Sequence, residues 1–508
     1  MPTRIRSAGI IGIEASPIDI EVDSVPGIHS FLLVGLPDKA VQESKDRISA
    51  AVRNSSFTPP SAKHKRITVS LAPADVRKEG PSFDLPIALG YLAETKQIQG
   101  DWHNTFFAGE LGLDGSVRPI RGALPLVLCA QAQGITEVVL PTENAQECAW
   151  IEGVSVFGAA SLGDVVAHIM KTHRLKKYLV TVGDGTQHED DPFEHIIGQT
   201  SAKRALTVAA AGGHNVLMFG APGSGKTLLA RALASLLPPL EHSEMLDVAR
   251  IYSAAGLLSG EPILRKRPFR NPHHTASATA VIGGGTIPRP GEISLAHRGV
   301  LFLDELPEFP RTVLESLRQP LEDGVVTIAR AAGSARLPAQ CMLVAAMNPC
   351  PCGNAGDPQL ECICSGASIM RYTKKISGPL LDRLDIQVRV PREVSLSLKK
   401  QEKSKDIDSV RAAIALAWNA QKERNARFGI LRNSDIRHGF IQDVCVLSSD
   451  AERLLEASAK VFKLSMRSIH RIQKIARTIA DLEGVARIEE KHLAEAVQLR
   501  TSDMASAA

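Results

Sequence analysis

One segment of this 508-residue chain limits its possible folds more than any other. It begins with four apolar residues, Val216–Phe219, a run that suits a strand buried on both faces of a parallel sheet. The loop GAPGSGKT and the helical pattern LLARALASLL follow without a break. In this order, backbone N–H groups and a helix N-terminus converge on phosphate oxygens. The segment therefore predicts an α/β fold, a parallel sheet with a phosphate-binding loop after a central strand.

The loop residues are predicted to share the binding of a nucleotide. Lys226 is expected to reach the β- and γ-phosphates, and Thr227 to ligate Mg²⁺. The other loop residues bring backbone amides to the phosphates, and they are Gly220, Gly223, Ser224 and Gly225. A chance glycine-rich loop is the alternative interpretation, and the flanking strand and helix count against it.

Two further strands are expected to end in residues that complete this site. The run Gly299–Leu303 leads into Asp304, placed to hold Mg²⁺, and Glu305, placed to polarise the attacking water. An acidic helix N-terminus is the alternative for this pair. The strand Met342–Ala346 leads to Asn348, which can position the water or can serve only as a turn residue. Together the motifs predict hydrolysis of a nucleoside triphosphate, and the lack of an N-K-x-D sequence favours ATP.

Composition and charge exclude some classes of protein. Hydrophobic residues make up 44% and charged residues 22%, which is ordinary globular usage. The net charge of +4 excludes a histone-like polycation but leaves room for a local basic loop that binds nucleic acid. The first apolar stretch is interrupted by Glu14, Asp19 and Glu21, unlike a signal peptide, and no apolar run is long enough to span a bilayer. A cytoplasmic protein without membrane contact is expected.

The chain is expected to divide into three parts joined by one linker. Residues 1–178 alternate strand and helix patterns, as in a compact α/β domain. A polar, acidic linker is predicted at 179–192, an α/β nucleotide-binding core at 193–391, and helices at 392–508. Helices are expected at 39–52, 85–92, 410–418, 451–459, 467–482 and 491–499, and N-terminal strands at 18–22, 67–71, 138–141 and 154–158.

Four cysteines are close together in the sequence, at Cys350, Cys352, Cys362 and Cys364. Four thiolates suit a closed tetrahedral Zn²⁺ site of structural type, and a metal there would brace the loop that precedes Arg383. Free buried thiols or a redox pair are the alternatives. The neighbouring histidines His273 and His274 are expected to point apart and to bind no metal.

The sequence resembles a known family over most of its length. Residues 267–309 (RPFRNPHHTASATAVIGGGTIPRPGEISLAHRGVLFLDELPEF), MNPCPCG and 372–385 (YTKKISGPLLDRLD) resemble the magnesium-chelatase-like AAA+ ATPases, a match that runs from 193 to about 499. Residues 69–92 (VSLAPADVRKEGPSFDLPIALGYL) resemble the Lon-protease C-terminal, ribosomal S5-type fold. The combination is similar to the ComM/YifB branch, whose members resemble DNA branch-migration helicases of natural transformation.

The resemblance implies roles for several residues. Asn348 takes the sensor-1 position and Arg467 the sensor-2 position, at the start of a helix after the N-cap residue Ser465. Arg383 takes the arginine-finger position and would reach the γ-phosphate of a neighbouring subunit, which implies a homo-oligomeric ring, expected to be a hexamer. A solvated or ion-paired surface arginine is the alternative for both arginines.

DNA contacts are expected on loops that enter the pore of the ring. The segment Val325–Gln340 is predicted to form a hairpin that turns at 332–334 and carries Arg330 and Arg336 toward phosphates. A second loop or hairpin tip is expected at 282–291. Structural roles for both arginines are an equal alternative.

The resemblance implies a motor that hydrolyses ATP to translocate on single-stranded or branched DNA. An AAA+ protein remodeller and a chelatase-type motor acting on a protein partner are the alternatives. A peptidase is disfavoured. Ser82 stands where the Lon-type fold keeps its nucleophile, but Leu124 replaces the companion lysine, so Ser82 has no evident activating base.

Overall fold

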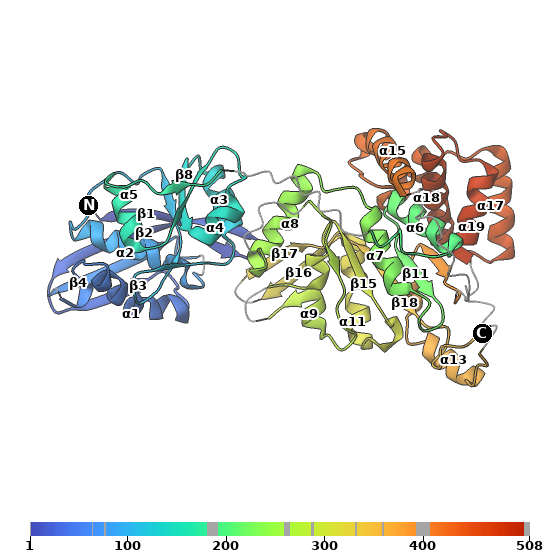
Figure 1. Ribbon diagram of the computed structural model, residues 1–508, viewed down its shortest axis with the longest axis horizontal. Helices are drawn as coiled ribbons and strands as arrows, with labels where there is room; N and C mark the ends of the chain where they lie inside the picture. The colour runs from blue at the N-terminus through green and yellow to red at the C-terminus, as the bar shows by residue number, and fades with distance from the viewer. Residues whose placement is uncertain are drawn as a thin grey trace.

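The computed structural model describes residues 2–62, 64–75, 78–179, 191–258, 265–285, 289–330, 333–357, 360–392 and 407–501. They form an N-terminal α/β unit, a central α/β core and a C-terminal group of helices, which follow one another along the longest axis of the molecule (Figure 1). Most of the predicted linker, at 180–190, lies outside the described residues.

The N-terminal unit is built on an eight-stranded mixed sheet of order β10-β9-β8-β5-β1-β2-β4-β3. Its strands are β1 (Thr3–Ile11), β2 (Glu14–Pro26), β3 (Ser30–Val34), β4 (Lys65–Ala72), β5 (Thr105–Phe107), β8 (Glu137–Pro141), β9 (Ser155–Ala159) and β10 (Lys176–Lys177). Its helices are α1 (Lys39–Asn54), α2 (Asp84–Glu94), α3 (Ala123–Ala132), α4 (Thr142–Cys148) and α5 (Leu162–Ile169). The predicted N-terminal strands and helices are confirmed, while the Lon-type resemblance stays a prediction.

The core sheet has five parallel strands in the order β12-β15-β18-β11-β19. Their bounds are β11 (Val216–Phe219), β12 (Phe269–Arg270), β15 (Val300–Leu303), β18 (Met342–Met347) and β19 (Ile386–Arg389). Every residue of β11, β15 and β18 is buried, because helices cover both faces of a parallel sheet and leave only apolar residues inside. Helices α6 (Thr200–Gly212), α7 (Lys226–Leu236) and α8 (His242–Ala255) belong to this core. The predicted α/β class and the three central strands are confirmed.

Two antiparallel ribbons project from the core. Strands β13 (Gly283–Gly284) and β14 (Arg289–Pro290) form the expected insertion hairpin, whose tip at 286–288 lies outside the described residues. Strands β16 (Val325–Arg330) and β17 (Gly333–Pro338) form the second. Its predicted turn was placed too late by about two residues, since Gly333 and Ser334 already pair with β16 and only 331–332 separate the strands.

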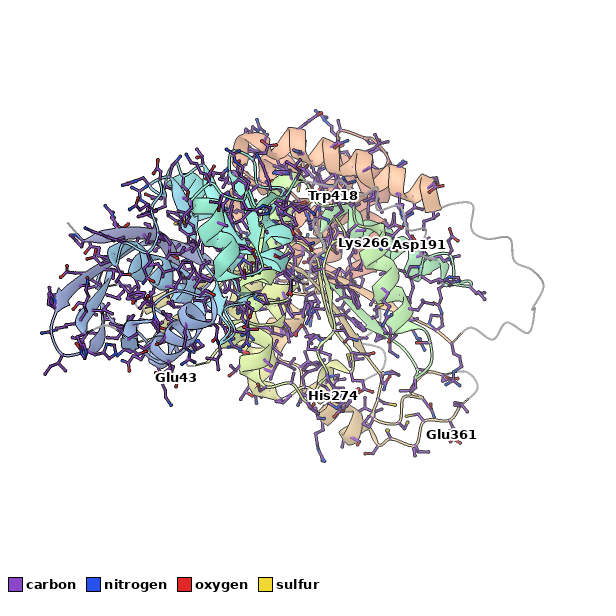
Figure 2. All side chains as sticks on the ribbon, turned by 60° about the vertical axis from the view of Figure 1, so that its left-hand side comes forward. Glu43, Asp191, Lys266, His274, Glu361 and Trp418 are labelled. Atoms are coloured by element: carbon purple, nitrogen blue, oxygen red, sulfur yellow. The ribbon has the colours of Figure 1, made fainter. Side chains whose placement is uncertain are left out.

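The C-terminal helices pack on the core and share its hydrophobic cluster. They are α15 (Ile407–Asn425), α17 (Ser449–Val461), α18 (Met466–Leu482) and α19 (Glu490–Thr501). Apolar residues of α18 such as Ile472 and Ile475 join one buried cluster with α6 and β11. Trp418 lies on the side of α15 that faces the core (Figure 2), where its indole N–H donates to the carbonyl of Ala210 at 2.9 Å. The four predicted helices are confirmed, and α15 is longer than expected.

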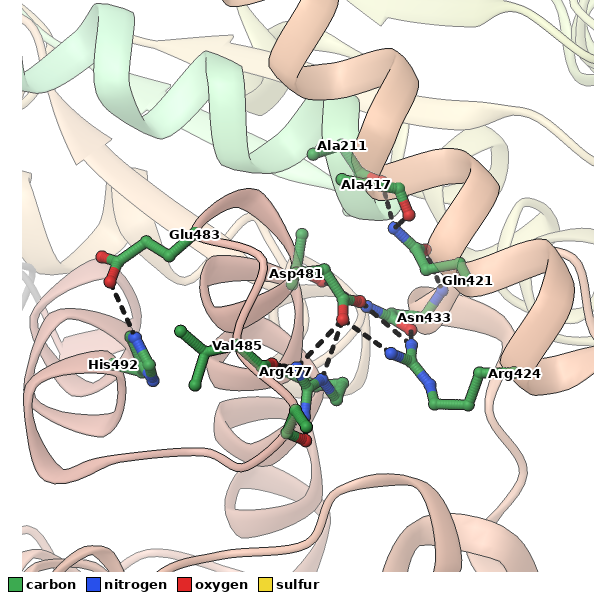
Figure 3. Close-up of polar contacts among 12 residues, drawn as sticks. Ala211, Ala417, Gln421, Arg424, Asn433, Arg477, Asp481, Glu483, Val485 and His492 are labelled. Carbon is green, nitrogen blue, oxygen red and sulfur yellow. Dashed lines mark hydrogen bonds and ion pairs between the residues drawn. The ribbon is translucent and has the colours of Figure 1, made fainter.

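A buried ionic network holds these helices together (Figure 3). The carboxylate of Asp481, on α18, accepts hydrogen bonds from both terminal nitrogens of Arg424 at 2.6 and 3.0 Å and from Asn433 Nδ2 at 2.8 Å. Arg477, one turn earlier, donates its Nε at 3.1 Å and also binds two carbonyls in the turn after α18. Because Asp481 and Arg477 are buried, each charge depends on the others for solvation.

Within the described residues, the N-terminal unit contacts the core at α8 and at the β16–β17 hairpin. At the first, α3 packs on α8, and the amide of Gly122 donates to the carbonyl of Ser253 at 2.9 Å. At the second, the β1–β2 turn reaches the β16–β17 hairpin (Figure 1). Ile13 is buried there among the apolar residues of the core, and Gly12 lies so close that a Cβ on it would be 3.2 Å from the Cβ of Ala335. The hairpin proposed to touch DNA therefore rests on the N-terminal unit.

Within the described part of the chain, no helix is both long and apolar enough to cross a membrane.

Candidate active site

The phosphate loop joins β11 to α7 in the conformation that its glycines allow. Gly223 and Gly225 have φ values of 76° and 88°, a region that residues with a Cβ rarely adopt. Gly220 is needed for a different reason, because a Cβ there would lie 2.1 Å from the carbonyl oxygen of Val390. The glycine spacing thus reflects both backbone conformation and close packing against the residue that follows β19.

Lys226 begins α7 and folds back over the loop. Its Nζ donates to the carbonyl oxygens of Gly220 at 2.8 Å and Ala221 at 2.9 Å, and to Asn348 Oδ1 at 3.3 Å. Burial lowers the pKa of Lys226 below its ordinary value, against the opposing charges of Asp304 and Glu305. A partly buried ammonium held by neutral carbonyls is suited to bind an anion.

An unpaired buried hydroxyl points to the same ligand. The hydroxyl oxygen of Ser224 is buried and has no hydrogen-bond partner among the described residues. An unpaired buried hydroxyl costs free energy unless a ligand satisfies it. Beside it, the space above Gly223 and Gly225 is open, since a Cβ at either position would meet no atom within 4 Å. The loop therefore fits a phosphate group.

The residues predicted to hold Mg²⁺ lie together. The hydroxyl of Thr227 donates to Asp304 Oδ2 at 2.9 Å, joining the start of α7 to the end of β15. Parallel β15 and β11 are separated only by β18, so their carboxyl ends meet at one edge of the sheet. A threonine hydroxyl and a carboxylate are oxygen ligands of the kind that Mg²⁺ prefers. The pair fits this ion.

Glu305 follows Asp304 in a left-handed backbone conformation, with a φ of 52°. Its amide donates to Asp304 Oδ1 at 2.9 Å, and its carboxylate is about half exposed. His274 Nδ1 lies 3.1 Å from Glu305 Oε2, so the histidine holds the carboxylate from a loop that is distant in sequence. Figure 2 shows His274 on the edge of the core that also carries the four-cysteine loop, where Glu361 is labelled.

The sequence interpretation of this histidine pair was wrong in one respect. The rings of His273 and His274 do not point apart, and their centroids are 4.1 Å from each other. His273 Nδ1 contacts the hydroxyl of Thr275 at 2.9 Å, and His274 turns to Glu305. The contact with Glu305 was missed, because it joins the loop after β12 to the end of β15, and no local spacing reports such a pairing.

The four cysteines form a cluster. The sulfur of Cys350 lies 3.3 Å from that of Cys352 and 3.6 Å from that of Cys362, and all four sulfurs are within 4.8 Å of one another. Tetrahedral zinc with bonds of about 2.3 Å needs sulfurs about 3.8 Å apart, so these distances fit. Hydrogen bonds from the amide of Asn354 and from the Cys350 thiol lower the pKa of Cys352 to about 6. A thiolate, the form that binds metal, is therefore favoured at Cys352.

The remaining predicted residues lie apart from the phosphate loop's immediate contacts. Arg383 turns toward α12 (Arg318–Asp323), where it pairs with Glu322 beside a surface pocket of about 290 Å³. Arg467 is exposed in the first turn of α18, whose N-cap Ser465 accepts from the Ser468 amide at 3.2 Å. Arg336 is exposed on β17, and the side chain of Arg330 lies outside the described residues.

Besides the predicted Arg467, α18 carries a second arginine near the core sheet that the sequence did not indicate. Arg471 forms an ion pair with Asp385, the residue that precedes β19. Burial alone would raise the pKa of Asp385, but the charge of Arg471 and the His214 imidazole, 3.7 Å away, hold it well below its ordinary value. This pair ties the C-terminal helices to the core sheet close to Arg383.

The strand order and the phosphate site define a P-loop protein of the AAA+ class. Three family descriptions match the chain: magnesium chelatase subunit ChlI at residues 192–398, subunit ChlI of Mg-chelatase at 20–144, and the ChlI C-terminal part at 402–500. The chain is 42% identical to the competence protein ComM of Haemophilus influenzae, covering 98% of this chain and 97% of that protein. It is 38% identical to YifB of Escherichia coli over the same shares, and 26% identical to the magnesium-chelatase 38 kDa subunit of Rhodobacter capsulatus over 59% of this chain and 84% of that subunit. The chain belongs to the ComM/YifB-type family of magnesium-chelatase-like proteins.

Proposed function

We propose that the chain is an ATPase whose subunits assemble into a ring and translocate on DNA, moving branch points during the integration of DNA in natural transformation. The observation that carries the ATPase part is the joining of Thr227, Asp304, Lys226 and Asn348 at one edge of the sheet. The DNA part is supported by 42% identity to a protein named for competence.

Each residue has a definite part in the proposed reaction. Lys226 and the amides of the phosphate loop bind the β- and γ-phosphates, and Ser224 gains a partner for its unpaired hydroxyl. Thr227 and Asp304 would hold Mg²⁺, which neutralises charge on the phosphates when bound. Glu305 accepts a proton from the attacking water, while His274 sets the direction of its carboxylate. Asn348 bridges Lys226 and the water.

Assembly as a hexameric ring would explain Arg383. Its guanidinium faces α12 and is ion-paired with Glu322, whose carboxylate is more than half exposed. A neighbouring subunit's nucleotide would compete with Glu322 for this arginine, since phosphate carries more charge than one carboxylate. Arg383→Ala should then abolish hydrolysis and leave nucleotide binding intact. Retained steady-state turnover in this variant would refute the arginine-finger role.

The cofactor proposal includes one structural Zn²⁺ per chain, held by the four cysteines. Four protein ligands leave no open position for chemistry, so the ion would act on folding of its loop. Metal analysis of the protein purified under reducing conditions tests this directly.

The decisive experiment measures ATP hydrolysis with single-stranded DNA, duplex DNA, a four-way junction and no DNA, with Glu305→Gln as the blank. We expect strong stimulation by DNA, and then junction migration in a gel assay. Turnover that no DNA changes would overturn the DNA motor. It would favour the second candidate, a motor that acts on a protein partner, for which the 26% identity to a magnesium-chelatase subunit is the supporting observation.

A further inference from the structure

The four-cysteine loop, residues 350–364, lies directly against the phosphate loop. Gly353 has a φ of 86°, and a Cβ added to it would lie 2.4 Å from Cδ of Pro222. Since real Cβ contacts are never so short, the backbone of Gly353 already touches the proline ring. Pro222 is the third residue of the loop GAPGSGKT, next to the first glycine whose φ is positive.

Two arginines at the end of β19 and just after it each bind one of the two loops. Arg389 Nη2, at the end of β19, donates to the carbonyl of Gly356 at 2.5 Å. Arg392 Nη2 donates to the carbonyl of Pro222 at 3.3 Å. Pro222 of the phosphate loop therefore contacts both Arg392 and the four-cysteine loop, so the position of the phosphate loop depends on where the four-cysteine loop lies.

The sulfur cluster holds the four-cysteine loop in position. Cys350 is fully buried, and its sulfur accepts a hydrogen bond from the amide of Ala355 at 3.3 Å, while its carbonyl accepts from the amide of Gly353 at 3.0 Å. The two ends of the loop meet at Cys362, whose sulfur lies 3.6 Å from that of Cys350 and 3.7 Å from that of Cys352. Six of the nine residues between the two C-x-C pairs, 353–361, are glycine, asparagine, proline or acidic, so this stretch has little apolar surface of its own to bury.

We propose that metal bound at Cys350, Cys352, Cys362 and Cys364 controls how tightly the phosphate loop holds nucleotide, through the contact of Gly353 with Pro222. With a divalent, thiophilic ion in place, the ends of the loop are joined and Gly353 presses on Pro222. Without the ion, no bond joins the four sulfurs, the ends of the loop separate, and the phosphate loop loses its contact with Gly353. Nucleotide binding at the active site then depends on the zinc available to the protein. This inference rests on the nucleotide binding proposed above.

The test compares zinc content and nucleotide affinity in the same samples of the full chain. Zinc is measured by elemental analysis, and the ion is removed with a chelator under reducing conditions. Affinity is measured by the fluorescence of a labelled, non-hydrolysable ATP analogue. We expect about one zinc per chain, and about fivefold weaker binding of the analogue after zinc is removed. Restoring zinc should restore the affinity.

Two variants separate the metal from the contact. Gly353→Ala keeps all four thiols but drives a methyl group into Pro222, so it should retain zinc, bind the analogue about fivefold more weakly, and respond no further to zinc removal. The double variant Cys362→Ser/Cys364→Ser should match the metal-free protein. Cys129→Ser, at a half-buried cysteine outside the cluster, is the control and should behave as the unchanged chain.

The outcomes distinguish this inference from the function it rests on. Unchanged affinity after zinc removal, with the analogue still bound, overturns the coupling and leaves the ATPase proposal standing. A chain that binds the analogue but no zinc overturns the metal site. A zinc-loaded chain that binds no analogue overturns the proposed function itself.

Discussion

The contact between the N-terminal unit and the core contains a buried carboxyl group whose ionisation should weaken it. Glu147, on α4, is 3% exposed, and its Oε1 accepts hydrogen bonds from Asn144 at 3.1 Å and from the hydroxyl of Ser253, on α8, at 3.4 Å. Burial raises the pKa of Glu147 from 4.5 to about 7, against these two hydrogen bonds. We predict that this contact loses stability as the pH rises from 5 to 8.

The sign and size follow from linkage. Below pH 4.5 the carboxyl is protonated whether the contact is closed or open, so its stabilising contribution is complete. As the pH rises toward 7 and beyond, the open form ionises first, and that contribution is lost. A pKa difference of about 2.5 corresponds to about 3 kcal/mol of stability of the contact. Between pH 5 and 8, the equilibrium constant for opening therefore rises by about two powers of ten.

Hydrogen exchange of α3 measures the opening, because the amide of Leu124 donates to the hydroxyl of Ser253 across this contact at 3.2 Å. The exchange rate of the unchanged chain is divided by that of Glu147→Gln at each pH, which removes the intrinsic pH dependence of exchange. We expect this ratio to rise about 100-fold from pH 5 to 8. Glu143→Gln, at an exposed carboxylate of the same helix, is the matched control. A ratio independent of pH, or an equal effect of the control, would refute the reasoning.

Three further perturbations test other parts of the structure. Asp481→Ala leaves the buried Arg477 and the partly buried Arg424 without their counter-charge, so it should lower the free energy of unfolding of the C-terminal helices by about 3–5 kcal/mol, measured by urea denaturation. Asp450→Ala, at an exposed ion pair, should change it by less than about 1 kcal/mol. Ile13→Ala should weaken the docking of the N-terminal unit on the β16–β17 hairpin by about 2–4 kcal/mol and should speed hydrogen exchange in β17. Unchanged exchange in β17 would contradict this contact. His274→Ala should lower kcat for ATP by up to about 100-fold with KM unchanged, because Glu305 loses its orientation, and an equal rise in KM would instead indicate a binding role.

Features that depend on short stretches of sequence were predictable. The run Val216–Phe219 and the loop after it specify a buried strand, a glycine-rich loop and a helix start, and all three are present. The strand before Asp304 follows the same rule. The spacing of the four cysteines also indicated a cluster, since each C-x-C pair already brings two sulfurs close together.

Pairings between distant segments were not predictable. His274 meets Glu305 because the sheet order brings the loop after β12 beside the end of β15, and Arg383, just before β19, meets Glu322 on α12 through packing of distant segments. A sequence without alignment carries no periodicity or spacing that reports such neighbours. The turn of the β16–β17 hairpin was misplaced for a related reason: the strand register is set by partners across the ribbon.

The sequence by itself determined the phosphate loop, the acidic strand end and the cysteine cluster, because backbone geometry over a few residues decides each of them. Only the tertiary structure decided that Gly353 rests on Pro222 and that the β1–β2 turn supports the hairpin carrying Arg336. Those contacts arise from the packing of surfaces far apart along the chain, where burial and shape, and not local conformation, select the partner.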